Sequence, residues 1–119
     1  MNDGIIKTYF KNGTLASETE YKDGKKHGTC KVYLLNGQLR AVGKCVEGKM
    51  TGEWKWYRED GKLWQVGNFK NEIKDGKWER YAATGELFDV GFFTNGQKSG
   101  EWKVFDKQGK VTKTKKYEQ

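Results

Sequence analysis

The sequence TGEWKWYREDGKLWQVG, residues 51–67, places Trp54, Trp56, Tyr57 and Trp64 within eleven positions and separates them with charged residues. Aromatic residues interleaved with bases are typical of a surface that binds nucleic acid, sugar or lipid. They are equally the residues that supply a thin protein with its core, because each ring buries roughly 150–250 Å². The rest of the chain bears on this choice, because it repeats this stretch.

Glycine recurs with a period of 24 residues, and positions within a unit are counted here from the glycine that opens it, as position 0. That first series comprises Gly4, Gly28, Gly52, Gly76 and Gly100. A second series, at position 9, comprises Gly13, Gly37, Gly61, Gly85 and Gly109. Shorter series at positions 15 and 20 account for the remaining glycines: Gly43, Gly67, Gly91, Gly24, Gly48 and Gly96. Such a period indicates a repeat architecture.

Apolar residues follow the same period. Position 2 holds Ile6, Cys30, Trp54, Trp78 and Trp102. Position 5 holds Tyr9, Tyr33, Tyr57, Tyr81 and Phe105, and position 17 holds Tyr21, Cys45, Phe69, Phe93 and Tyr117. The pattern predicts one repeat domain over residues 1–119, with units 4–27, 28–51, 52–75, 76–99 and 100–119.

Each unit contains the signals of a β-hairpin. An Asn-Gly or Asp-Gly pair between apolar runs, as at Asn36 and Asp60, predicts a tight hairpin turn. A second glycine, at position 20, marks the return turn, and the absence of proline suits a sheet throughout. We therefore predict an all-β fold, an elongated single antiparallel sheet of stacked hairpins with about ten strands. At ~4.8 Å per strand it would be roughly 45–50 Å long.

Two hairpin registers remain open. A two-residue turn places Trp54 opposite Gly67, where the indole would shield the glycine of its own hairpin. A three-residue turn with a bulge pairs Tyr57 with Leu63 instead.

The segments YKDGKKHGTCKVYLLNGQL and GEWKWYREDGKLWQVGNF resemble MORN repeats, most closely the bacterial variant found in antitoxin-like proteins. The resemblance covers nearly the whole chain and implies a scaffold of stacked hairpins. It also implies contact with another protein, such as a partner toxin, or with acidic phospholipid headgroups. Two departures stand out: Glu72 replaces the return-turn glycine of the third unit, and Cys30 replaces the tryptophan of the second.

Composition excludes several classes of protein. No apolar run approaches the ~20 residues that span a bilayer, and the first residues lack the apolar stretch of a secretory signal. The sequence is therefore expected to be cytoplasmic, or peripheral at a membrane. We expect no enzyme, cofactor or metal, because the single histidine, His27, lies where a return turn is expected and no nucleophile has a matching base.

Cys30 and Cys45 occupy positions 2 and 17 of the same unit, so they are expected to lie near one another across a hairpin. Two buried free thiols are the main interpretation. A disulfide and, with less support, a metal site are the alternatives.

Six residues are candidates for partner binding. Trp56 and Trp64 occupy slots where other units have no tryptophan, so the repeat itself does not demand them. Lysine recurs at position 3, which predicts a basic column able to attract an acidic partner or lipid. The full set is Lys31, Lys55, Trp56, Arg58, Trp64 and Lys103.

The leading hypothesis is a non-enzymatic scaffold that binds another protein, with an antitoxin-like role as one form of it. The alternative is a peripheral module that binds acidic phospholipid surfaces through the lysine column. Nucleic acid is disfavoured, because 16 acidic residues offset 23 basic ones to leave a net charge of +7, and no base-reading motif is present. The apolar first strand, IIKTYF, is a further candidate edge for pairing with another copy of the chain.

Overall fold

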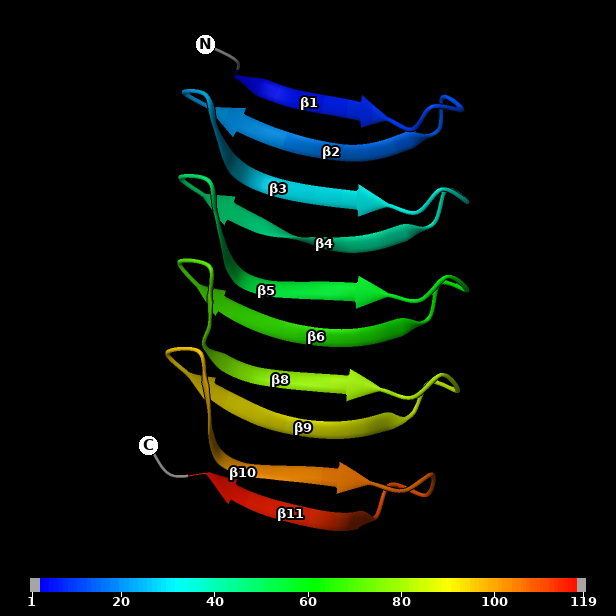
Figure 1. The fold of residues 1–119 in the computed structure, drawn as a ribbon, viewed down its shortest axis with the longest axis vertical. Coiled ribbons are helices and arrows are strands. Elements are labelled where there is room, and N and C mark those ends of the chain that lie inside the picture. Colours follow the sequence, from blue (N-terminus) through cyan, green and yellow to red (C-terminus); the bar gives the residue numbers. More distant parts are fainter. Residues whose placement is uncertain (1–2, 118–119) are drawn as a thin grey trace.

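The computed structural model describes residues 3–117, which form a single open antiparallel sheet of hairpins stacked along one axis (Figure 1). The described ends of the chain lie at opposite ends of that axis. The strands are β1 (Gly4–Tyr9), β2 (Leu15–Lys22), β3 (Lys25–Tyr33), β4 (Leu39–Val46), β5 (Lys49–Tyr57), β6 (Leu63–Lys70), β7 (Ile73–Lys74), β8 (Gly76–Tyr81), β9 (Leu87–Thr94), β10 (Gln97–Phe105) and β11 (Val111–Tyr117). The predicted all-β class and the single antiparallel sheet are confirmed.

Eleven strands are present among these residues rather than the predicted ten, because one strand is divided. β7 and β8 both pair with β6, and they are separated at Asp75, whose N–H donates to the carbonyl of Asn68 (3.0 Å). The molecule measures 49 × 33 × 16 Å, and its long dimension matches the predicted length of the stack. No helix long and apolar enough to cross a membrane occurs within the described chain.

The hairpin turns combine the two predicted registers. In the third unit Arg58 N–H donates to the carbonyl of Lys62 (2.8 Å) and Gly61 N–H to the carbonyl of Arg58 (2.9 Å). This is a three-residue loop with its glycine at φ 91°, so the two-residue turn is wrong. A bulge then restores the pairing of Trp54 with Gly67 that the two-residue turn predicted, while Tyr57 pairs with Leu63 as the three-residue turn predicted.

The bulge gives one slot in each unit a special role. Trp56 pairs with Gln65 and Tyr57 pairs with Leu63, which leaves Trp64 without a residue opposite it. The same register shift occurs in all five hairpins, so position 12 is always the extra residue. Trp64 is 40% exposed there.

The return turns require two successive residues with positive φ. Asp23–Gly24, Glu47–Gly48 and Asn95–Gly96 meet this requirement with a glycine second, as a type I′ turn prefers. In the third unit Glu72 takes the second place, with φ 71°. Its N–H nevertheless makes the same hydrogen bond as Gly48 and Gly96 make in their turns, because it donates to the carbonyl of Met50 in the preceding unit (2.8 Å). The fold therefore imposes a glycine conformation on a glutamate.

We expect Glu72→Gly to stabilise the protein by about 1 kcal/mol, because an L-residue in this region is strained by about that amount. Thermal unfolding followed by circular dichroism should show a melting temperature higher by a few degrees. Gly48→Glu is the reciprocal control: it introduces the same strain at the matching turn, where a Cβ meets no neighbour, and should lower the melting temperature. A less stable Glu72→Gly protein would contradict the strain interpretation.

The indole rings pack differently from the expected arrangement. Trp54 pairs in register with Gly67, but its ring lies on Gly43 of the preceding hairpin. Trp78 lies likewise on Gly67, and Trp102 on Gly91. Each Nε1–H then donates to the backbone carbonyl of the residue that follows the covered glycine, at 3.0, 3.0 and 3.1 Å. The expectation that tryptophan shields the glycine of its own hairpin is wrong, and the ring instead joins two hairpins.

This packing explains where glycine is needed. A Cβ on Gly43, Gly67 or Gly91 would fall far inside van der Waals contact with the covering indole, and these glycines have no positive φ. Position 15 thus requires glycine because there is no room for a side chain, and not because the backbone adopts a conformation that only glycine favours. Where the next unit has no tryptophan, the glycine disappears, as at Thr19, which pairs with Cys30. Tryptophan at position 2 and glycine at position 15 of the preceding unit therefore form one packing unit.

Candidate binding face

One face of the sheet carries an almost continuous run of aromatic rings, which we call the aromatic face. Successive ring centroids lie 5.3 to 6.3 Å apart, and most contacts are edge-to-face, as aromatic pairs prefer. The run comprises Trp54, Trp56, Phe69, Trp78, Phe93, Trp102 and Tyr117. Since the sheet is a single layer, these rings are its core and part of its surface at once.

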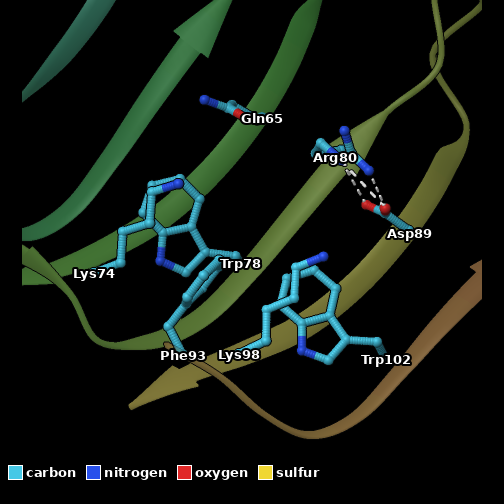
Figure 2. A pocket seen from close by; sticks show the side chains of 8 residues that line it. All are labelled: Gln65, Lys74, Trp78, Arg80, Asp89, Phe93, Lys98 and Trp102. Atoms are coloured by element: carbon cyan, nitrogen blue, oxygen red, sulfur yellow. Dashed lines mark hydrogen bonds and ion pairs between the residues drawn. The ribbon is translucent and has the colours of Figure 1, made fainter. Parts of the chain in front are cut away.

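Lysine side chains lie over these rings. Lys74 Nζ is 4.8 Å from the centroid of Trp78 and 4.9 Å from that of Phe93. Lys98 Nζ is 4.9 Å from Trp102 (Figure 2). In such contacts the ring quadrupole attracts the cation, and the lysine stems cover apolar surface. The lysines thus shield the aromatic face while presenting their charges outward.

A pocket of about 220 Å³ lies on the aromatic face between Trp78 and Trp102, and an ion pair lines it beside these rings. Arg80 and Asp89 are neighbours across β8 and β9, with Nη2 to Oδ2 at 2.5 Å and Nε to Oδ1 at 3.0 Å (Figure 2). Asp89 is 5% exposed, and its hydrogen bonds raise the pKa of the Arg80 guanidinium further above its usual range. Gln65 completes the polar side of this pocket.

The two faces differ in the number of carboxylates that lie among their cations. Strand residues of the aromatic face include the cations Lys26, Lys74, Arg80, Lys98, Lys113 and Lys115. Within the described strands this face has one carboxylate, Asp89, which is bound to Arg80. A second carboxylate, Glu72, reaches the face from a turn. The opposite face interleaves lysines with glutamates, as in Lys7–Glu18 (3.8 Å) and Lys77–Glu79 (3.8 Å). Cations and carboxylates are therefore interspersed on the opposite face, whereas the cations of the aromatic face have few carboxylates among them.

The structure separates the six predicted binding residues. Lys31, Lys55 and Lys103 project from the opposite face, since each alternates along its strand with a residue of the aromatic face. Lys55 lies 4.0 Å from Glu53. Trp56 belongs to the aromatic face, is partly buried, and stacks on Trp78 with centroids 5.5 Å apart. The column of lysines and Trp56 therefore cannot contact one flat partner surface together.

Arg58 and Trp64 lie near the hairpin loops. Arg58 Nη2 donates to the carbonyl of Tyr81 in the next unit (2.8 Å), while its Nε is buried and makes no hydrogen bond. Trp64 is the bulge residue described above. Arg58 thus links two hairpins, and Trp64 is the more exposed of the two non-repeating tryptophans.

Sequence reasoning missed the lysines that lie on the rings. Position 22 holds Lys26, Met50, Lys74 and Lys98, and each residue pairs across the return hairpin with position 17. The 24-residue period contained this signal. It could be interpreted only with the return-turn register, which places position 22 on the same face as the aromatic residues.

Cys30 and Cys45 are free and buried, 5% and 3% exposed, as in the main interpretation of the sequence. They face one another diagonally across β3 and β4, and the Cys30 thiol donates to Sγ of Cys45 at 3.1 Å. Burial, together with the hydrogen bond to Cys30, raises the pKa of the Cys45 thiol from 9.0 to about 12. The thiolate is therefore strongly disfavoured in the folded protein.

We expect both thiols to react slowly with a thiol reagent at pH 8 in the native protein, and two thiols to titrate after denaturation without reductant. Because folding raises the Cys45 pKa, the unfolded chain loses this proton first, and stability should fall as pH rises from about 9 towards 12. Cys45→Ala should flatten that decline. Finding no thiol in the denatured, unreduced protein would instead establish a disulfide.

The described residues contain no cluster of three or more His, Cys, Asp or Glu side chains able to hold a metal ion. His27 lies within β3 and not in the return turn where the sequence placed it, because that turn is formed by Asp23 and Gly24.

Fold and face together define a repeat-built sheet with one face formed by buried and partly buried aromatic rings under lysine side chains. The chain belongs to the MORN repeat variant family, whose model matches residues 2–23, 26–43 and 50–71. It is accordingly a repeat scaffold module. A search of curated protein sequences found no significant match.

Solved structures resemble the fold. A crystal structure of a glycine-to-arginine mutant of S. aureus TarM, in complex with Fondaparinux, alpha-GlcNAc-glycerol and UDP, aligns over 81% of this chain with a TM-score of 0.51 and 10% identity. A second TarM structure aligns over 82%, with the same TM-score and identity. The chain spans 19% of the length of either TarM chain. At this identity the likeness concerns the fold alone.

Proposed function

We propose that this chain is a non-enzymatic MORN-type scaffold that binds another protein across its aromatic face. The observation that carries the proposal is the aromatic face itself, where rings and ammonium groups lie together and the one carboxylate of the described strands is bound to Arg80. Rings and ammonium groups share one face, whereas the lysines of the other alternate with glutamates. Protein interfaces are enriched in aromatic residues at their centre, and a positive face selects a partner of opposite charge.

The partner that fits this surface is an acidic protein. Lys74 and Lys98 stand at the same position of successive units, two strands apart, so their charges recur at about 10 Å. A row of carboxylates on a partner could approach them in register. The resemblance to antitoxin-like repeats further supports a role in which binding neutralises the partner, and coexpression with a candidate toxin would test that role by growth rescue.

The phospholipid alternative is less well supported. It relied on the lysines of position 3, and these project from the face that also carries Glu18, Glu53, Glu79 and Glu101. An acidic bilayer would meet both signs of charge there.

Two charge-reversal variants separate these functions. Lys74→Glu with Lys98→Glu alters the aromatic face, and Lys31→Glu with Lys103→Glu alters the opposite face by the same net charge. Each purified protein would be used to capture partners from cells that carry its gene, and each would be sedimented with vesicles containing acidic lipid.

In the capture experiment we expect the unaltered chain and the Lys31/Lys103 variant to retain the same partner protein. The Lys74/Lys98 variant should not retain it. Matching melting curves would show that both variants are folded. Salt-sensitive sedimentation with vesicles that depends on Lys31 and Lys103, without any retained protein, would contradict the proposal and support the lipid alternative.

A further inference from the structure

The run of rings on the aromatic face is interrupted in the second unit. The ring contacts described above begin at Trp54 and continue to Tyr117. In the second unit, positions 2 and 17 hold Cys30 and Cys45, where later units have tryptophan at position 2 and phenylalanine or tyrosine at position 17. Two large rings are therefore replaced by two small side chains within one hairpin.

These replacements leave a hollow of about 550 Å³ on the aromatic face, larger than the pocket beside Trp78. Its floor is apolar and consists of Cys30, Ala41 and Cys45, each at most 5% exposed. Trp54 and Trp56 bound it on the side of the third unit. The size and the apolar floor are those of a site that takes a small molecule or a side chain.

The hollow lies where rings stand in the other units. Tyr21 of the first unit lines it on one side, and the two tryptophans of the third unit line it on the other. Val32, at the slot that Trp56 fills in the next unit, is 39% exposed. An aromatic ring placed here would complete the run from Tyr21 to Tyr117, with the edge and stacking contacts that rings favour.

The polar groups around the hollow indicate the charge of its occupant. Lys26 and Arg40 line it, against one carboxylate, Glu72. The remaining strand cations of the aromatic face add to this potential over a longer range. The surroundings therefore favour an occupant that carries negative charge next to its ring.

We propose that the hollow receives an aromatic side chain from an acidic segment of the partner protein. The inference rests on the proposed function and adds to it the central contact of the interface. Aromatic residues inserted into desolvated pockets are the contacts that dominate protein interfaces.

The probe is the unlabelled peptide acetyl-Asp-Trp-Asp amide, titrated into the ¹⁵N-labelled protein. The five indole N–H signals report on the location of binding. We expect the signals of Trp54 and Trp56 to shift and that of Trp102, near the other end of the sheet, to stay unchanged. Acetyl-Lys-Trp-Lys amide, the matched control, should bind at least about tenfold more weakly because it meets Lys26 and Arg40.

Two variants fill the hollow from within. Val32→Trp repeats the arrangement of Trp56 at an exposed position. Thr19→Gly with Cys30→Trp installs the glycine and tryptophan pair that later units use, and so supplies the ring together with the space it needs. Both variant proteins should fold and should bind the peptide at least about tenfold more weakly. Because the two variants fill the hollow by independent substitutions, the same loss in both would not be due to misfolding.

A charge pair completes the test. Arg40→Glu should weaken binding of the acidic peptide several-fold, whereas Lys113→Glu, an equal change of charge on the same face near β10, should not. Shifts confined to Trp78 and Trp102, or unchanged binding by both filled variants, would overturn the inference. The filled variants could retain the partner protein while the Lys74→Glu, Lys98→Glu double variant loses it. That result would overturn the proposal that the hollow receives an aromatic side chain, and the proposed function would stand.

Discussion

Replacing Gly67 with alanine should destabilise the protein by about 3 kcal/mol and lower its melting temperature by about 10 °C. The added Cβ would overlap the six-membered ring of Trp78, which lies flat on this glycine. Moving the ring would also strain the bond from its Nε1 to the carbonyl of Asn68. The backbone is not the cause, because Gly67 has no positive φ and alanine fits its conformation.

The first two units provide the control for this prediction. They already contain the alternative arrangement, in which Thr19 pairs with Cys30 and no indole is present. Gly67→Ala combined with Trp78→Cys should therefore lose less stability than the sum of the two single changes. Additive losses in this double-mutant cycle, measured by urea unfolding, would show that the ring and the glycine are not coupled.

The second large effect is expected for Trp78→Ala, which should cost about 3–5 kcal/mol. Trp78 is 6% exposed and contacts Trp56, Phe69 and Phe93. Its ring also carries the ammonium of Lys74. Removing it would open a cavity that a single-layer sheet has no second layer to fill, so the loss should lie at the upper end for a core residue.

Trp64→Ala is the matched control, because it removes the same side chain from an exposed bulge. We expect a change of less than about 1 kcal/mol in urea unfolding. Trp56→Ala should fall between the two, since Trp56 is partly buried against Trp78. Equal losses for Trp64 and Trp78 would contradict the assignment of the aromatic face as the core.

The period predicted most of the fold because it repeats a local signal. The glycine at position 9 follows asparagine or aspartate in the first three units and marks a hairpin turn in all five, and five such hairpins leave little freedom in strand order. The period did not reveal which neighbour an indole covers. Trp54 has a glycine on both adjacent strands, Gly43 and Gly67, and the choice depends on how the side chain leans in the twisted sheet. That choice is a property of packing rather than of spacing.

The candidate binding face was harder to predict. Lysines at position 3 form a visible column in the sequence, but the pairing of Lys7 and Lys31 with Glu18 depends on which strands lie side by side. The lysines at position 22 become part of the aromatic face only through the return-turn register. Trp56 and Trp64 are alike in the sequence as residues that do not repeat. The bulge leaves Trp64 on the surface, and the strand alternation turns Trp56 onto the aromatic face.

The most direct test of binding through the aromatic face is lysine footprinting of the free chain and of its complex with the captured partner. Acetylation rates of individual lysines would be measured by mass spectrometry in one sample, so the two faces control for one another. Binding through the aromatic face predicts protection of Lys26, Lys74 and Lys98, with Lys31 and Lys103 unchanged. Protection of Lys31 and Lys103, with Lys74 and Lys98 still reactive, would contradict it.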